Sequence, residues 1–270
     1  MSGSSWEALL DWFLERGSAL VAFSGGVDST LLARAAAEAL GDRALALTAV
    51  SASLAPAELD DARALAANIG ITHVLETSGE TSLPQYLVND ADRCYHCKTE
   101  LYRICAGVAS ERGLAVIVNG LNTDDLSDHR PGSRAADEAG VRSPFVELGF
   151  DKAAIREHSE RLGLPTASKP ELACLASRFP TGTPITIAGL EQVSAAERVV
   201  AELGFSQYRV RFHGDVARIE IPAGEIGRLV DDGLREKLLS GVRDVGFRFV
   251  TVDLAGYKRG SSNPVSMGQD

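Results

Sequence analysis

Residues 19–29, ALVAFSGGVDS, place a short apolar run directly before two glycines and the start of a helical pattern. The run 19–23 predicts a buried strand, and the Ala- and Leu-rich stretch 28–40 predicts a helix that Gly41 ends. Glycine lets a backbone turn tightly and approach a ligand closely. The unpaired amides and positive dipole end of a helix start favour an anion. This stretch therefore predicts a phosphate-binding turn between a strand and a helix.

Seven consecutive residues of this turn are candidate nucleotide ligands. They are Ser24, Gly25, Gly26, Val27, Asp28, Ser29 and Thr30. The turn lacks the lysine of the Gly-x4-Gly-Lys-Ser/Thr loop, which excludes that class of NTPase. From local chemistry alone, a plain strand–helix turn capped by Asp or Ser explains the pattern equally well.

Strands and helices alternate through the first half of the chain. Further strands are expected at 44–50, 73–76 and 115–119, and further helices at 56–68, 98–112 and 152–162. This alternation predicts an α/β fold with a doubly wound parallel sheet and helices on both faces.

The alternation of strands and helices stops between residues 165 and 184, where four prolines predict a long loop. Beyond it, an amphipathic helix at 185–203 and three strands at 208–212, 216–221 and 246–252 predict a smaller α+β domain. The expected division is a first domain 1–165, an active-site loop 166–184, a second domain 185–257 and a mobile tail 258–270.

Composition narrows the class of protein. The 270 residues carry a formal net charge of −10, which argues against a general nucleic-acid binder. No apolar run reaches the length of a membrane span, and the first residues lack the pattern of a signal peptide. We therefore expect a cytoplasmic protein without a membrane or nucleic-acid partner. Four cysteines are too few for a disulfide scaffold.

The cysteines differ in their surroundings. Cys94 and Cys97 form a Cys-x2-Cys pair just before the helix expected at Lys98, a spacing that suits a shared metal or two buried thiols. Cys105 falls inside that helix and is expected in the core. Cys174 lies in the proline-flanked loop near cationic side chains, which favour a thiolate, although a structural thiol is the alternative.

Arginines gather after this loop. Arg209 and Arg211 share one face of an expected strand, and Arg218 with Glu220 lies on the paired strand. Together with Arg178 they could form a phosphate site. A solvated face with salt bridges is the more common arrangement.

The stretch SGGVDS closely resembles the pyrophosphate-binding loop (PP-loop) of the adenine nucleotide alpha hydrolase superfamily. That resemblance implies cleavage of ATP between its α and β phosphates. It also implies that the loop holds pyrophosphate and that Asp28 positions Mg²⁺.

Further segments sharpen the resemblance. The stretches 119–126, 129–132, 174–178 and 209–220, taken with the loop, resemble the ATP-dependent sulfur transferases called LarE. These enzymes act in synthesis of the nickel-pincer nucleotide cofactor of lactate racemase. The resemblance covers about residues 18–257, and Cys-Leu-Ala-Ser-Arg at 174–178 is its most discriminating part.

The resemblance implies that ATP adenylates a carboxylate of pyridinium-3,5-biscarboxylic acid mononucleotide. A sulfur nucleophile then displaces AMP, and the product is a thiocarboxylate. In the sacrificial branch Cys174 gives up its sulfur and becomes dehydroalanine. Relatives with three cysteines instead bind a [4Fe–4S] cluster, and Cys94, Cys97 and Cys174 fit that pattern. The sequence favours this cluster over a sacrificial Cys174. Zinc bound by the same three thiols is a third option.

We expect roles for further residues as well. The candidate catalytic residues are Cys174, Asp28 and Lys98. The nucleotide site also includes Gly120, Asp124 and Asp125. The residues expected to bind the substrate phosphate are Ser177, Arg178, Arg209 and Arg211. The base for the elimination is not identified by the sequence, and Glu197 and Glu220 are weak candidates. The family suggests a homo-oligomer.

Three other functions remain open. A tRNA thiolase shares the loop and the paired cysteines, but it predicts a basic RNA-binding surface. Amide-forming relatives such as NAD or GMP synthetases need neither Cys174 nor the cysteine pair. A nucleotide sensor would bind ATP without turnover.

Overall fold

The computed structural model describes residues 4–127, 131–170, 173–205 and 207–258. The chain divides into two compact units. Unit 1 comprises Met1–Glu80 and Asp92–Leu172, and unit 2 comprises Thr81–Ala91 and Ala173–Asp270. The main division falls inside the expected loop 166–184. Two of the expectations, the segment at 129–130 and the tail beyond residue 258, lie outside the described residues.

Unit 1 is built on a four-stranded sheet. Its strands are β1 (Ala19–Ala22), β2 (Ala44–Val50), β3 (Thr72–Thr77) and β4 (Val116–Val118), in the order β3-β2-β1-β4. All three pairings are parallel. The strand order changes direction at β1: β2 and β3 are added on one side of β1, and β4 is added on the other side. Ligands of open parallel sheets bind at such a switch point, beyond the carboxyl ends of the strands.

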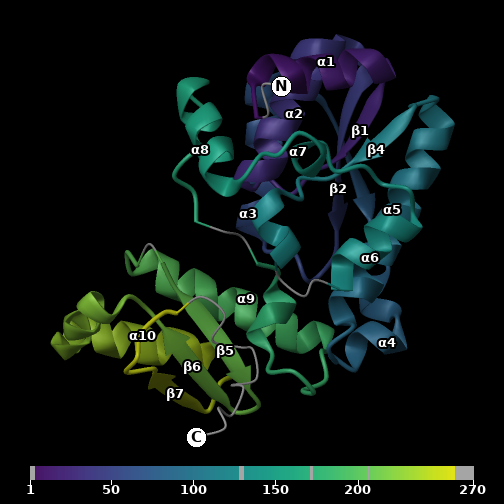
Figure 1. The fold of residues 1–270 in the computed structure, drawn as a ribbon. Coiled ribbons are helices and arrows are strands. Elements are labelled where there is room, and N and C mark those ends of the chain that lie inside the picture. The colour runs from purple at the N-terminus through teal and green to yellow at the C-terminus, as the bar shows by residue number, and fades with distance from the viewer. Residues whose placement is uncertain (1–3, 128–130, 171–172, 206, 259–270) are drawn as a thin grey trace, which may run out of the picture. The chain divides into compact units, whose positions relative to one another are not determined.

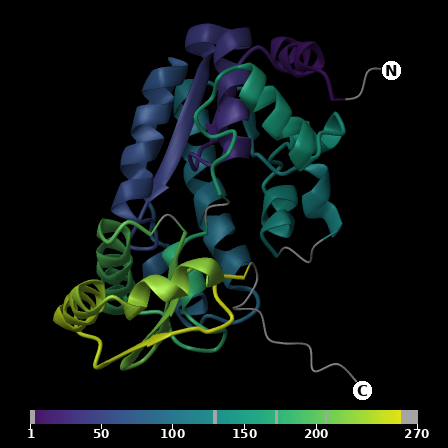
Figure 2. The same cartoon turned by 90° about the vertical axis from the view of Figure 1, so that its left-hand side faces the viewer.

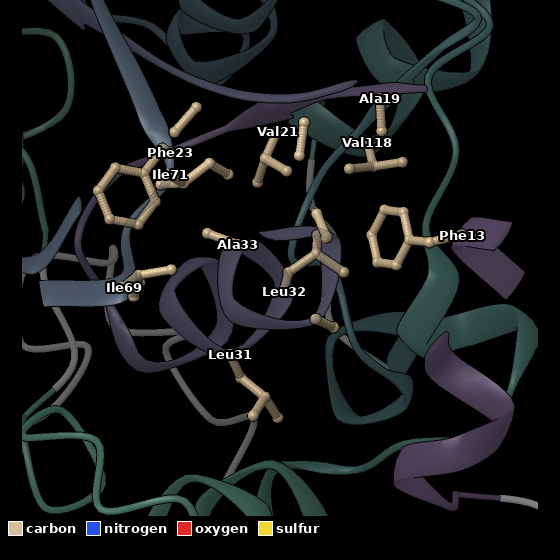
Figure 3. Packing of buried hydrophobic residues seen from close by; sticks show 14 of the residues in the cluster. Phe13, Ala19, Val21, Phe23, Leu31, Leu32, Ala33, Ile69, Ile71 and Val118 are labelled. Carbon is tan, nitrogen blue, oxygen red and sulfur yellow. The ribbon is translucent and has the colours of Figure 1, made fainter. Parts of the chain in front are cut away.

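Helices cover both faces of this sheet, which confirms the doubly wound architecture (Figure 1). They are α1 (Trp6–Arg16), α2 (Val27–Leu40), α3 (Pro56–Ile69), α5 (Arg93–Arg112), α6 (Pro131–Glu138), α7 (Pro144–Glu147) and α8 (Lys152–Arg161), with 3-10 turns at Gly41–Arg43 and Thr123–Ser127. On one face Val21 and Val118 pack with Leu32 of α2 (Figure 3). On the other face Leu20 packs with Cys105 of α5, whose side chain is fully buried, as expected.

The start of α5 differs from the sequence expectation. The helix begins at Arg93 rather than Lys98, so Cys94 and Cys97 lie inside the helix and not before it. No side chain caps this end. Contacts with α6 stabilise the extra turn instead, since the Tyr95 hydroxyl donates to Glu138 at 2.6 Å. Such a contact between two helices cannot be predicted from the local sequence.

Unit 2 is a smaller α+β unit, as expected. It contains α4 (Pro84–Leu87), a 3-10 turn at Leu175–Arg178, α9 (Ile187–Glu202), β5 (Arg209–His213), β6 (Val216–Glu220), a 3-10 stretch at Ala223–Val230, α10 (Asp232–Asp244) and β7 (Phe249–Val252). Strands β5 and β6 form the expected antiparallel hairpin, and β7 pairs parallel with β6. Helices α9 and α10 lie side by side in both views (Figures 1 and 2).

The segment 81–91 joins unit 2, which the sequence did not indicate. The buried Asn89 side chain donates to the carbonyls of Pro180 and Thr183, and its own carbonyl accepts from Gly182. These contacts hold the segment beside the stretch that follows Cys174. Across the described ranges, no helix is both long and apolar enough to cross a membrane.

Candidate active site

The turn between β1 and α2 has the geometry of an anion cradle. Gly25 has φ +71°, in the left-handed region that favours glycine, and a Cβ there would lie 3.3 Å from the Ala62 Cα. Gly26 occupies the cap position of α2, and no side chain caps the helix. The first amides of α2 are therefore left for a ligand, beside the positive end of the helix dipole.

Two serines shape this turn. The Ser29 hydroxyl donates to the Gly26 carbonyl at 3.2 Å and accepts from the Ser24 amide at 3.3 Å. The Ser24 hydroxyl accepts from the Gly26 amide and lies 3.1 Å from the Ser29 hydroxyl. Both side chains that the sequence offered as phosphate ligands thus also hold the backbone of the loop in its conformation.

Asp28 has a cationic partner that the sequence analysis missed. Lys152, the first residue of α8, places its Nζ 2.8 and 2.7 Å from the two carboxylate oxygens of Asp28. Asn122 also donates to Asp28 at 3.2 Å, and the Lys152 amide donates to Asp124 at 3.0 Å. No local motif marks Lys152, because the two partners are 124 residues apart in sequence.

Gly120 contributes to the site through its small size. It follows β4, and a Cβ at this position would lie 2.9 Å from the Asp28 Cβ and 3.1 Å from the Ser29 amide nitrogen. The backbone that follows β4 therefore contacts the first turn of α2. The structure brings Gly120, Asp124 and the loop together at the carboxyl end of the sheet, and Asp125 accepts there from the Asn122 amide.

A neutral histidine supports the entrance of the loop. The Thr48 hydroxyl donates to the Phe23 carbonyl at 2.7 Å and so accepts from His73 Nε2 at 2.8 Å. Burial, with a smaller contribution from Arg63, lowers the pKa of His73. The imidazole is therefore neutral near pH 7 and anchors the residue that precedes Ser24.

The segment that carries Cys174 lies in unit 2. Cys174 is exposed, while the next two residues, Leu175 and Ala176, are buried. The Ser177 amide donates to the Cys174 carbonyl at 2.9 Å. Buried Phe179 closes the segment by stacking on a phenylalanine of β5 at a ring distance of 4.6 Å. The thiol is thus presented on a short turn with apolar anchors.

Arg178 was expected to bind phosphate, but its guanidinium is engaged within unit 2. It forms a bidentate pair with Glu197 of α9 at 2.8 and 3.0 Å, and its side chain is 3% exposed. Its third nitrogen donates to the carbonyls of Ala173 and Cys174 and to the Ser177 hydroxyl. All three nitrogens therefore have acceptors in the chain.

Arg211 is also paired. It donates to Glu220 at 2.8 Å and to the Ser177 carbonyl at 3.0 Å, and Arg218 contacts the other oxygen of Glu220 at 3.1 Å. Glu197 and Glu220, the two weak candidates for a base, are thus held by guanidinium groups. Their oxygens serve as partners of the arginines, and the base for an elimination is not identified.

Arg209 has a different environment. Burial, followed by repulsion from the Arg178 guanidinium, lowers the pKa of Arg209. Its guanidinium carbon lies 5.3 Å from the centre of the Tyr257 ring. A bound anion would relieve this unfavourable surrounding, because an opposite charge favours the protonated form.

The other two cysteines of the expected trio lie in unit 1. Cys94 is exposed, Cys97 is half-buried, and an Arg93 nitrogen lies 3.6 Å from the Cys94 sulfur. Lys98 is exposed on the same turn of α5. Within the described residues, no group of three or more His, Cys, Asp or Glu side chains is arranged to hold a metal ion. Cys174, the third member of the expected trio, belongs to unit 2.

Glu197 and Lys152 show what sequence reasoning missed. Glu197 falls on the buried face of α9, between Val193 and Val200, and a charged residue on an apolar face is a signal for a buried partner. Lys152 offers no comparable signal.

Comparisons with known proteins identify relatives of this chain. The family model described as NAD synthase matches residues 15–82, which contain β1, the loop and β2. The chain is 45% identical over 98% of its length to an uncharacterized protein of Synechocystis, 99% of which is covered. It is 38% identical over 90% of its length to the pyridinium-3,5-bisthiocarboxylic acid mononucleotide synthase of Lactiplantibacillus plantarum, of which 88% is covered. An uncharacterized protein of Methanocaldococcus jannaschii is 27% identical over 88% of this chain and 90% of its own length.

Proposed function

Because the chain belongs to the family of the pyridinium-3,5-bisthiocarboxylic acid mononucleotide synthase, the LarE sulfur transferases, we propose that it is an ATP-dependent sulfur transferase. It adenylates a carboxylate of pyridinium-3,5-biscarboxylic acid mononucleotide and converts it to a thiocarboxylate. The observation that carries the proposal is the combination of the anion cradle at Ser24–Thr30 with an exposed Cys174 on an anchored turn.

Unit 1 would perform the adenylation. A carboxylate is a poor electrophile, and its mixed anhydride with AMP is a good one. Negative charge grows on pyrophosphate as it leaves, and the free amides at the start of α2 are oriented to stabilise it. Mg²⁺ would neutralise further charge on the phosphates. Asp28 is the residue that fits this ion, since each of its oxygens can accept from Lys152 and still offer a lone pair.

Unit 2 would deliver the sulfur. The Cys174 thiolate attacks the acyl carbon, AMP leaves, and a thioester forms. A base then removes the Cα proton of Cys174, the Cβ–S bond breaks, and its electron pair stays on sulfur. The products are the thiocarboxylate and dehydroalanine at position 174. The exposure of Cys174 supports its attack on a bound acyl group.

The substrate phosphate would bind at Arg209. Arg209 is half-buried, and burial with repulsion from Arg178 lowers its pKa, so a bound anion would stabilise its charged form. Arg211 and Ser177 are its proposed companions. Replacing Arg209 with Gln should raise the Kd for the mononucleotide at least about tenfold while ATP binding stays unchanged. Arg228→Gln, at another arginine of unit 2, is the matched control.

A [4Fe–4S] cluster on Cys94, Cys97 and Cys174 remains the second possible source of sulfur. Its support is the cysteine pair at the start of α5, where Cys94 is exposed, Cys97 is half-buried and their i and i+3 positions share one helix face. Its three expected ligands are divided between unit 1 and unit 2, and no step is derived through a cluster. The homo-oligomer, the cytoplasmic location and the role of Lys98 also stay predictions.

The test is a reaction with ATP, Mg²⁺ and pyridinium-3,5-biscarboxylic acid mononucleotide, in which pyrophosphate, AMP and thiocarboxylate are measured. The wild-type protein should form all three. Cys174→Ala should still release pyrophosphate but form no thiocarboxylate, and Cys105→Ala should behave as the wild type because Cys105 is buried in the core. Absence of mononucleotide-dependent pyrophosphate release from the wild-type protein would reject the proposal.

A further inference from the structure

We propose that the buried Arg178–Glu197 ion pair is a positioning device for Cys174 and does not itself contact the substrate. This inference rests on the role proposed above for Cys174. The pair fixes the backbone of residues 173–177, so that the sulfur is held at one place relative to β5.

The first argument is how the donors of Arg178 are used. Two nitrogens of its guanidinium donate to Glu197, and the third donates to the Ala173 and Cys174 carbonyls and to the Ser177 hydroxyl. A phosphate would have to displace contacts that already satisfy all three nitrogens. The side chain is 3% exposed, which leaves little surface for a ligand.

The second argument is what Glu197 adds. Its Oε1 accepts from Arg178 and also from the Val210 amide at 3.0 Å, so one carboxylate joins the Cys174 turn to β5. Arg209, the proposed phosphate ligand, is the neighbour of Val210 in that strand. The Glu197 carboxylate therefore fixes the position of the Cys174 turn relative to Arg209, the residue that would hold the substrate.

The third argument is energetic. A buried ion pair contributes little net stability compared with apolar packing, because desolvation offsets the attraction. Its planar, bidentate geometry instead fixes direction, which apolar contacts do not. Displacing a reacting atom by about 1 Å can slow a reaction by about a hundredfold. The charged pair is thus understandable as a means of orientation.

The experiment compares Arg178→Lys with Arg228→Lys. Arg228 is a matched control, since it also pairs with a glutamate of unit 2 and donates to two backbone carbonyls, those of Leu203 and Gly204. Lysine keeps the charge at either site but cannot make the bidentate pair. Hydrogen exchange is followed in peptides that cover residues 173–180, and the single-turnover rate of thiocarboxylate formation is measured with ATP and the mononucleotide.

For Arg178→Lys we expect exchange in residues 173–180 to accelerate at least about tenfold, because the Ser177 and Phe179 amides bond inside this turn. The single-turnover rate of thiocarboxylate formation at saturating substrate should fall at least about tenfold, while pyrophosphate release and the half-saturating mononucleotide concentration change less than about twofold. Arg228→Lys should leave the exchange of residues 173–180 and the rate of transfer unchanged.

Unchanged exchange at residues 173–180 would overturn the inference. So would a raised half-saturating mononucleotide concentration with an unchanged maximal single-turnover rate, and that result would return Arg178 to the phosphate site. If Arg178→Lys does not fold, Glu197→Gln takes its place, because it keeps the shape of the side chain and should show the same pattern with a smaller change. If the wild-type protein forms no thiocarboxylate, the proposed function fails, and hydrogen exchange still decides whether the pair fixes the turn.

Discussion

The phosphate loop of unit 1 and the Cys174 turn of unit 2 are built in opposite ways. The loop is made by neighbours in sequence, since glycines, two serines and the start of α2 shape it within six residues. The turn is held by partners far along the chain, Glu197 and Arg211, which reach it from α9 and β5. The contacts that shape a loop made by sequence neighbours can be predicted from its motif, whereas the distant side chains that hold a turn cannot.

The largest effect is expected where the Cys174 turn depends on buried charge. Glu220→Gln removes the carboxylate that compensates Arg211 in the interior, where Glu220 is fully buried. We expect the free energy of unfolding to fall by about 3 kcal/mol. Urea titration followed by circular dichroism measures it. The matched change in the phosphate loop, Ser29→Ala, removes one neutral hydroxyl and should cost about 1 kcal/mol. Equal losses of unfolding free energy in the two variants would contradict the difference between the phosphate loop and the Cys174 turn.

The phosphate loop should respond most strongly to added volume. In Gly120→Ala the new Cβ would lie 2.9 Å from the Asp28 Cβ and displace the start of α2. We expect kcat/KM for pyrophosphate release to fall by about a hundredfold. Gly107→Ala in α5, where a Cβ meets nothing within 4 Å, is the control and should leave this rate unchanged. A wild-type rate for Gly120→Ala would show that the close approach is not needed.

Lys152 tests whether the loop is as local as the contrast states. Lys152→Met removes the partner of Asp28 while keeping much of the side-chain volume. We expect about a tenfold loss in kcat/KM for pyrophosphate release, since Asp28 loses the cation that orients it. Lys152→Arg should retain more activity than Lys152→Met. If both variants keep the wild-type rate, backbone geometry alone accounts for the phosphate loop.

The smallest effect concerns acid sensitivity. The pKa of His73 lies below its ordinary value of 6.5 because of burial and the nearby Arg63. The unfolded chain therefore binds this proton at a higher pH than the folded one, so stability is present above pH 6.5 and is lost as pH falls. His73→Gln should reduce the fall in stability between pH 7 and 5.5 by less than about 1 kcal/mol. Urea titrations at both pH values check this, and an unchanged pH dependence would contradict it.

Much of the fold could be predicted from the sequence because apolar runs and glycines act locally. The four strands of the parallel sheet and the hairpin of unit 2 lie at the expected places. The phosphate loop lies at the carboxyl end of β1, as expected from its glycines.

The errors and omissions share another cause. The first turn of α5 depends on Tyr95 and α6, and the membership of 81–91 in unit 2 depends on Asn89. The partners of Asp28 and Arg178 come from α8 and α9. Each depends on a tertiary contact between segments whose own sequences favour no particular partner. The arginines were identified as a group, but their carboxylate partners decide what each can bind.

The most direct test of the account is a single anaerobic reaction. Protein, ATP, Mg²⁺ and pyridinium-3,5-biscarboxylic acid mononucleotide are mixed, and the amount of thiocarboxylate and the intact protein mass are measured together. The account predicts that each thiocarboxylate formed is matched by loss of the elements of H₂S from one protein chain, with dehydroalanine found at position 174. Thiocarboxylate formed while the protein mass stays unchanged would contradict Cys174 as the donor and place the sulfur source elsewhere.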